Sequence, residues 1–171
     1  MLELLQKVLI GLFGCALIFF PIAYRIMDKV RFHGRMCIRQ MDGDLLRWID
    51  AASALVALDE RDAEAIAEFD RLSAAYRAAK ANKEAEKVRL VNAIYAVVEK
   101  AAILSYGDAR AAALCEELRD IYSDFSILAD DYNENARKLN EQLDGGVTGA
   151  FGRLFRIRPE PLLENLNDLK Y

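Results

Sequence analysis

The chain reads VLIGLFGCALIFFPIAY from Val8 to Tyr24, a run of 17 residues without a charged or amide side chain. As an α-helix this run would cover roughly 25 Å, slightly less than the ~30 Å hydrocarbon core of a bilayer. Lys7 and Arg25 bound the run and can extend toward the two interfaces. We therefore predict that residues 1–25 form a transmembrane anchor, with a lipid-facing core of Val8, Leu9, Ile10, Leu12, Phe13, Leu17, Ile18, Phe19, Phe20 and Ile22.

Three other interpretations of this run are weaker. A cleaved signal peptide should end in small residues, but the run ends in Ile22, Ala23 and Tyr24. A lipoprotein signal would make Cys15 the modified residue, yet apolar residues continue well beyond it. A buried core helix seldom needs so many consecutive apolar residues. The anchor remains the preferred interpretation.

The charges beside the run predict its orientation. The basic residues downstream are Arg25, Lys29, Arg31, Arg35 and Arg39, opposed only by Asp28. By the positive-inside rule, the N-terminus lies outside and the C-terminal domain in the cytoplasm. The expected location is therefore the cytoplasmic (inner) membrane, with a single pass. Three cysteines without a CxxC pair agree with a reducing compartment.

Residues 26–144 have the composition of long helices. Between Asp44 and Asp144 there is no proline and one glycine, Gly107, and strong helix formers dominate. Small or apolar residues recur at steps of three and four from Met27 to Leu55, which predicts a first helix continuous with the anchor. Asp59 is the expected N-cap of a second helix. The polar patch from Lys80 to Lys83 is the one plausible turn before a third, and the sequence leaves open whether these two helices form a single rod.

A fourth helix has the clearest pattern in the chain. Gly107 and Asp108 mark its start, and Gly145 and Gly146 mark its end. Its apolar positions recur with an average period of about 3.6 residues, at Leu114, Leu118, Ile121, Phe125, Leu128, Tyr132, Ala136, Leu139 and Leu143. The fold prediction is therefore all-α, with a single N-terminal transmembrane helix that continues into an antiparallel bundle of three or four long helices.

Residues 145–171 differ in composition from the residues of the predicted bundle. Bulky apolar residues alternate with Arg153, Arg156 and Arg158, and two prolines follow. The preferred interpretation is a segment folded back across the bundle, with its arginines in water. The alternatives are a basic, aromatic element that touches anionic lipid headgroups and a disordered tail. The candidates for interaction or fold-back are Tyr132, Asn133, Asn140, Phe151, Arg153, Leu154, Phe155, Arg156 and Arg158.

The end of the fourth helix and the segment after it resemble LemA-family proteins. Tyr132-Asn133 matches the first of two Tyr-Asn dipeptides seven residues apart, and Leu139-Asn140 occupies the second position. Leu154, Phe155, Ile157 and Pro159 follow in the register of the family's Leu-Phe-x-Phe element. Two family prolines are missing, one of them replaced by Gly145-Gly146. The resemblance implies a membrane-tethered helical bundle and supplies no catalytic residues.

Asn133 and Asn140 flank the inward stripe of the fourth helix, where asparagine is a poor helix former unless its amide is bonded. We expect both to bond the folded-back tail, with partner binding as the alternative. No other pattern predicts chemistry. With only one histidine, His33, the chain cannot build a His-rich zinc site or a pair of Glu-x-x-His motifs, and no phosphate-loop or nucleophile motif occurs. We expect no cofactor, no metal and no enzymatic activity.

The leading functional hypothesis is a membrane-anchored scaffold or interaction protein of LemA-like type. The expected partners are the membrane and further copies of the chain, since the apolar run and the first helix offer lateral contacts; another membrane or cytoplasmic protein is also a candidate. The net charge of −4 argues against nucleic acid. The alternatives are an envelope-spanning, spanin-like helical protein and a membrane-surface remodelling protein.

Overall fold

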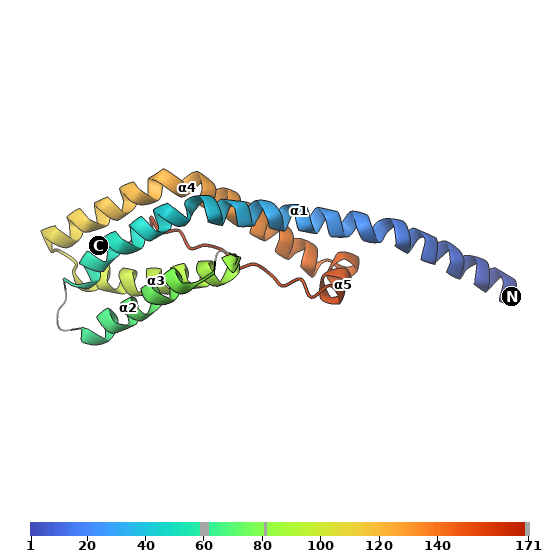
Figure 1. Cartoon of the computed structure of the whole chain (residues 1–171), viewed down its shortest axis with the longest axis horizontal. Coiled ribbons are helices and arrows are strands. Elements are labelled where there is room, and N and C mark those ends of the chain that lie inside the picture. Colours follow the sequence, from blue (N-terminus) through green and yellow to red (C-terminus); the bar gives the residue numbers. More distant parts are fainter. Residues whose placement is uncertain (59–61, 81, 170–171) are drawn as a thin grey trace.

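The computed structural model describes residues 1–58, 62–80 and 82–169, without the side chains of Leu2, Leu12, Phe13, Ala16, Leu17 and Val147. These described residues form helices and no strand. The helices are α1 (Leu2–Val56), α2 (Ala63–Ala78), α3 (Glu84–Leu104), α4 (Ala109–Asp144) and α5 (Gly146–Leu154). The prediction of an all-α chain is confirmed. Figure 1 shows α1 to α4 lying side by side in alternating directions, with the first part of α1 projecting beyond the others.

Helix α1 is one continuous helix of 55 residues that contains Pro21. At 1.5 Å per residue it is about 80 Å long. Its second half packs along α4, and its first half projects as an arm toward the N-terminus (Figure 1). As predicted, the apolar run and the first helix of the bundle form one continuous helix. The bundle therefore fixes the direction of the projecting part.

The predicted transmembrane anchor is not supported. Within the described part of the chain, no helix has both the length and the apolar character that crossing a bilayer requires. This finding overturns the single-pass location in the inner membrane. Of the anchor residues, Val8, Leu9, Ile10, Ile18, Phe19 and Ile22 are exposed and Phe20 is half-buried, whereas the side chains of Leu12, Phe13 and Leu17 lie outside the described part.

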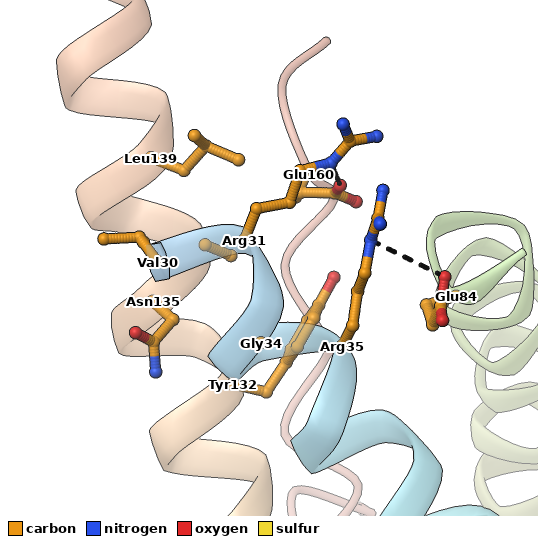
Figure 2. A pocket seen from close by; sticks show the side chains of 10 residues that line it. Val30, Arg31, Gly34, Arg35, Glu84, Tyr132, Asn135, Leu139 and Glu160 are labelled. Carbon is orange, nitrogen blue, oxygen red and sulfur yellow. Dashed lines mark ion pairs between the residues drawn. The ribbon is translucent and has the colours of Figure 1, made fainter. Parts of the chain in front are cut away.

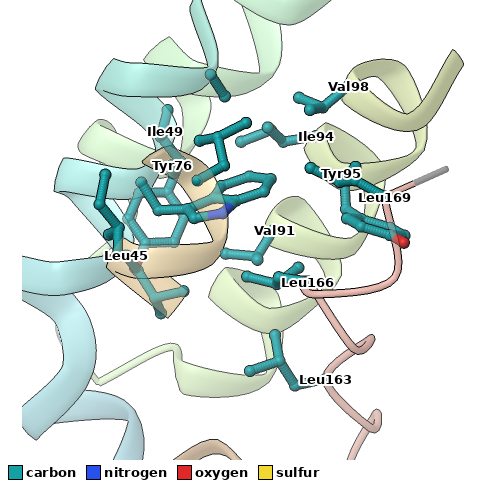
Figure 3. Close-up of a cluster of buried hydrophobic side chains, with 14 of the residues drawn as sticks. Leu45, Ile49, Tyr76, Val91, Ile94, Tyr95, Val98, Leu163, Leu166 and Leu169 are labelled. Carbon is teal, nitrogen blue, oxygen red and sulfur yellow. The ribbon is translucent and has the colours of Figure 1, made fainter. Parts of the chain in front are cut away.

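The core lies between the second half of α1 and helices α2, α3 and α4. Trp48 of α1, Tyr76 of α2 and Phe125 of α4 are its largest fully buried side chains. Figure 3 shows Tyr76 among aliphatic residues of α1 and α3, together with Leu163, Leu166 and Leu169 from the C-terminal tail. Residues 155–169, which follow α5 and contain no helix, are called the tail below. Its three leucines make it part of the core.

Helices α2 and α3 are separate, which answers the question that the sequence left open. Asp62 is the N-cap of α2 and accepts a hydrogen bond from the backbone N–H of Ala65 (3.0 Å). The expected cap, Asp59, lies outside the described residues. Helix α2 ends at Ala78, and α3 begins at Glu84 after an N-cap lysine, Lys83, whose side chain makes no capping bond.

Helix α4 follows the predicted pattern closely. Asp108 caps it by accepting a hydrogen bond from the backbone N–H of Arg110 (2.7 Å), and Gly107 has a φ of 88°, a left-handed conformation that favours glycine. Leu118, Phe125 and Leu139 of the stripe are buried, while Leu128 is only half-buried because Ala129 takes the inward position beside it.

The short helix α5 was not expected. Gly145 ends α4 as predicted, but the chain then forms another helix that turns back toward α1 (Figure 1). Gly149 and Gly152 bring α5 so close to the end of α4 that a Cβ on either would collide with Leu143. Their lack of a side chain is therefore what allows α5 to pack there.

Candidate interaction site: the arm of α1 and the junction at its base

The arm, defined as residues 3–22 of α1, is fixed at its base by aromatic side chains of α5 and the residue after it. The rings of Phe20 and Phe151 meet edge to face with centroids 4.0 Å apart, and Phe155 packs against Phe20 and Tyr24 at 5.6 and 5.4 Å. Such pairs stabilise by about 0.5–1.5 kcal/mol beyond the area that they bury. The predicted fold-back residues Phe151 and Phe155 therefore contact the arm rather than the end of the bundle.

The contacts of α5 cover only one face of α1. Ala23 and Met27 lie on the covered face and are buried, with 6% and 1% of their surface exposed. The opposite face of the arm carries Leu4, which is 70% exposed, and Ile18, which is 68% exposed. Large apolar side chains that are exposed together on one face of a helix usually mark an interaction site.

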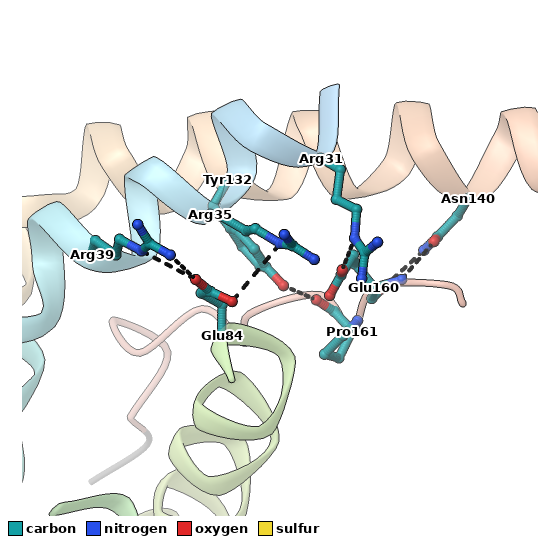
Figure 4. A network of polar contacts seen from close by, with 8 residues as sticks. All are labelled: Arg31, Arg35, Arg39, Glu84, Tyr132, Asn140, Glu160 and Pro161. Carbon is teal, nitrogen blue, oxygen red and sulfur yellow. Dashed lines mark hydrogen bonds and ion pairs between the residues drawn. The ribbon is translucent and has the colours of Figure 1, made fainter. Parts of the chain in front are cut away.

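Below the arm, a polar junction joins α1, the start of α3 and the tail (Figure 4). Glu84 is only 4% exposed and accepts two hydrogen bonds from Arg39, at 3.1 and 2.9 Å, while its second oxygen lies 3.8 Å from Nε of Arg35. On the other side, Nε of Arg31 lies 3.5 Å from a carboxylate oxygen of Glu160. Between these pairs, beside Gly34 and Tyr132, lies a cavity of about 10 Å³, enough for about one water molecule (Figure 2).

Polar side chains of α4 hold the tail in place. The amide of Asn133 donates to the carbonyl of Leu163 (2.9 Å) and accepts from its N–H (2.8 Å). Asn140 makes the same pair of bonds with the backbone of Glu160, both at 2.9 Å. The hydroxyl of Tyr132 donates to the carbonyl of Pro161 (2.6 Å). These three side chains therefore supply hydrogen-bond partners to the extended backbone of the tail, which has no neighbouring strand among the described residues.

Two residues that bind the tail, Asn92 and Arg119, were missed in the sequence; Arg119 donates to the carbonyl of Leu169 (3.0 Å). Asn92 of α3 donates to the carbonyl of Leu162 (2.7 Å) and accepts from the N–H of Glu164 (3.0 Å). The polar residues Glu84 and Lys87 were missed as well, although they continue the apolar stripe of α3 at Val91 with steps of three and four. Polar residues in register with an apolar stripe are the signal that could have revealed them, because such positions face the protein interior.

A second polar cluster lies deeper, between α1, α2 and α3. Asp42 accepts hydrogen bonds from the hydroxyl of Tyr76 and from Nζ of Lys87, both at 2.6 Å. Lys87 also lies 4.9 Å above the centre of the Tyr76 ring. Burial, together with the bond to Asp42, raises the pKa of Tyr76. Asp42 and Lys87 neutralise each other here, so this partly buried cluster ties three helices together.

Titratable groups beside the tail are shifted by burial. Burial raises the pKa of Tyr132, and the negative charge of Glu160 adds to this effect. Burial also raises the pKa of Cys37 and Cys115, and the charge of Asp131 contributes at Cys37. Across the described residues, no three or more His, Cys, Asp or Glu side chains gather where they could hold a metal ion.

The arginines predicted to face water or lipid lie in two places. Arg153 and Leu154 are exposed at the end of α5. Arg156 and Arg158 line a hollow of about 360 Å³ together with residues of α1 and α3. The structure thus separates the fold-back candidates into four groups: one bonds the tail, one packs on the arm, one lines the hollow, and one, Arg153 and Leu154, is exposed at the end of α5.

The chain matches no family model, no curated protein and no solved structure. Its function is therefore inferred from its own geometry.

Proposed function

We propose that the chain is a non-catalytic assembly scaffold, in which the bundle holds out the arm of α1 so that the arm can pair with the arm of a second copy. The observation that carries this proposal is the apolar surface of the arm. Its large side chains with more than two-fifths of their surface exposed are Leu4, Leu5, Val8, Leu9, Ile10, Ile18, Phe19 and Ile22. Such a run of exposed apolar side chains is typical of a binding surface.

The arm also has the spacing of a helix-pairing seam. Leu4, Val8, Gly11, Cys15, Ile18 and Ile22 follow one another at steps of 4, 3, 4, 3 and 4, and all are exposed. This is the a/d spacing of a coiled coil, and the small residues at its centre allow two helices to approach closely. The face that α5 covers, at Phe20 and Ala23, lies to one side of this seam.

Charge favours an antiparallel pair. In a parallel pair, Glu3 would face Glu3 and Lys7 would face Lys7, and like charges repel. In an antiparallel pair centred on Cys15, Glu3 lies within about one turn of Arg25 and Lys29 of the partner subunit. Opposite charges then meet at both ends of the seam.

The other hypotheses have less support. An envelope-spanning protein needs a membrane-spanning helix, and none of the described helices provides one. The resemblance to LemA-family proteins between Tyr132 and Pro159 fits a scaffold, since the matched residues Tyr132 and Asn133 bond the tail and Phe155 packs on α1.

The test compares two isoleucine variants in the full chain. Ile18 lies on the seam and Ile10 lies off it, and both are highly exposed, at 68% and 64%. Light scattering over a dilution series should show that the chain is a dimer, that Ile18→Glu is a monomer and that Ile10→Glu still dimerises. A monomeric parent chain, or equal effects of the two variants, would refute the pairing.

Disulfide trapping tests the orientation. Mild oxidation should link the exposed Cys15 to Cys15 of the partner subunit. In a Cys15→Ser background, Leu4→Cys should cross-link with Ile26→Cys but not with itself. If the dimer dissociates when neutral lipid vesicles are added and the arm transfers to them, lipid is the preferred occupant of the seam and the proposal fails.

A further inference from the structure

A basic hollow of about 360 Å³ lies where α1, at Arg31 and Arg35, meets the start of α3 and the tail. It is open to solvent and lies away from the exposed seam. Three carboxylates line it, those of Glu84, Glu86 and Glu160. Its basic residues are Arg31, Arg35, Lys83, Arg89, Arg156 and Arg158. The hollow therefore has an excess of three positive charges, six minus three.

Every carboxylate in the hollow already has a basic partner. Glu160 pairs with Arg31 at 3.5 Å and Glu84 with Arg35 at 3.8 Å. Glu86 pairs with Lys83 at 2.7 Å. The excess charge is thus carried by the three remaining arginines.

Arg89, Arg156 and Arg158 make no side-chain hydrogen bond or ion pair with any described residue. They come from two elements, since Arg89 belongs to α3 and the other two to the tail. Three guanidinium groups that line one hollow repel one another. An anion between them would remove this repulsion.

The backbone directs the tail arginines into the hollow. Arg156 has a φ of 54°, a left-handed conformation that is strained in a residue other than glycine. Its N–H donates to the carbonyl of Arg153 (3.1 Å), and the next N–H, of Ile157, donates to Gly152 (2.9 Å). This turn ends the helical stretch of α5 and leads the chain past the hollow at Arg156, Arg158 and Pro159.

The N-terminus of α3 opens into the same hollow, at Lys83, Glu84 and Ala85. Asp62 and Asp108 cap α2 and α4 with side-chain bonds, whereas α3 has no side-chain cap. Its first N–H groups, with the partial positive charge of a helix N-terminus, add to the field of the three arginines.

We propose that this hollow binds a phosphate group, either of a free phosphate or of a lipid headgroup. The planar guanidinium of arginine forms two parallel hydrogen bonds with phosphate, and the volume exceeds what a single phosphate group fills. The site is independent of the seam, so dimerisation and phosphate binding can be tested separately.

The experiment is calorimetric titration of the full chain with pyrophosphate, in parallel with flotation on vesicles of phosphatidic acid and of neutral phosphatidylcholine. Arg156→Gln, Arg158→Gln and Arg89→Gln should each weaken binding about tenfold or more. Arg153→Gln is the matched control, because it removes the same charge three residues away but does not line the hollow. It should leave binding within about twofold.

Each outcome of these two measurements either supports the phosphate site or overturns it. Tight pyrophosphate binding that depends on the three arginines supports the site with free phosphate as its ligand. Arginine-dependent flotation on phosphatidic acid alone supports it with a lipid headgroup. The proposal is overturned by the absence of binding in both arms, by flotation that is equal on neutral vesicles, or by a loss in Arg153→Gln as large as in Arg156→Gln, which would indicate a diffuse basic surface.

Discussion

Replacing Asn133 by alanine should release part of the tail from α4. The variant loses the donor to the carbonyl of Leu163 and the acceptor for its N–H, at 2.9 and 2.8 Å. Each such bond contributes about 1 kcal/mol net, and Leu163 is too deeply buried to regain both partners from water. Alanine is a better helix former than asparagine, which returns about 0.6 kcal/mol. We expect a net loss of about 1.4 kcal/mol in the free energy of unfolding.

The matched control is Asn135→Ala on the same helix. Asn135 donates only to the carbonyl of Asp131, one turn back on the exposed surface (2.7 Å), so the substitution gains the same helix propensity and loses little else. Urea denaturation of both variants gives the free energies, and hydrogen exchange of the Leu163 amide reports the local opening. A difference below about 0.5 kcal/mol between the variants, with unchanged exchange at Leu163, would refute the role of Asn133 in holding the tail.

Three further predictions concern the core. Leu118→Ala should cost about 2–5 kcal/mol in urea denaturation, because Leu118 is fully buried in the α4 stripe. The free energy of unfolding should fall as pH rises from about 10 toward 12, because folding raises the pKa of Tyr95 to about 12 and also raises the pKa of Tyr132. Helicity and tyrosinate absorbance should change together over this range. A helicity that stays constant with pH would contradict this prediction. In the monomeric Ile18→Glu variant, a thiol reagent should react quickly with the exposed Cys15 and slowly with the buried Cys115, whose pKa burial raises, and equal rates would show that the core is open.

Local periodicity predicted the helices well. The stripe of α4 needs only a regular spacing of apolar residues, and the caps at Asp108 and Gly107 need only their neighbours in sequence. The boundary between α2 and α3 was also visible as a polar patch. These features depend on contacts within one or two turns of helix, which a sequence displays directly.

Features that depend on distant contacts were not predictable. Composition alone suggested a membrane-spanning run, but it could not show that Phe151 and Phe155 cover part of that run. Helix α5 was missed because its glycines indicate a turn, whereas here they permit close packing on Leu143. The hydrogen-bond partners of Asn92 lie 70 and 72 residues away along the chain, and no local sequence pattern indicates contacts over such a distance.

The position of the tail sets an order of events during synthesis on the ribosome. Leu163, Leu166 and Leu169 fill the core beside α1 and α3, yet they are translated after every helix. At about 5–20 residues per second, the interval between Val56 and Leu169 lasts on the order of 10 s. The core face of α1 cannot be fully covered during that time. The nascent chain should therefore be a substrate for chaperones until translation has passed Leu169.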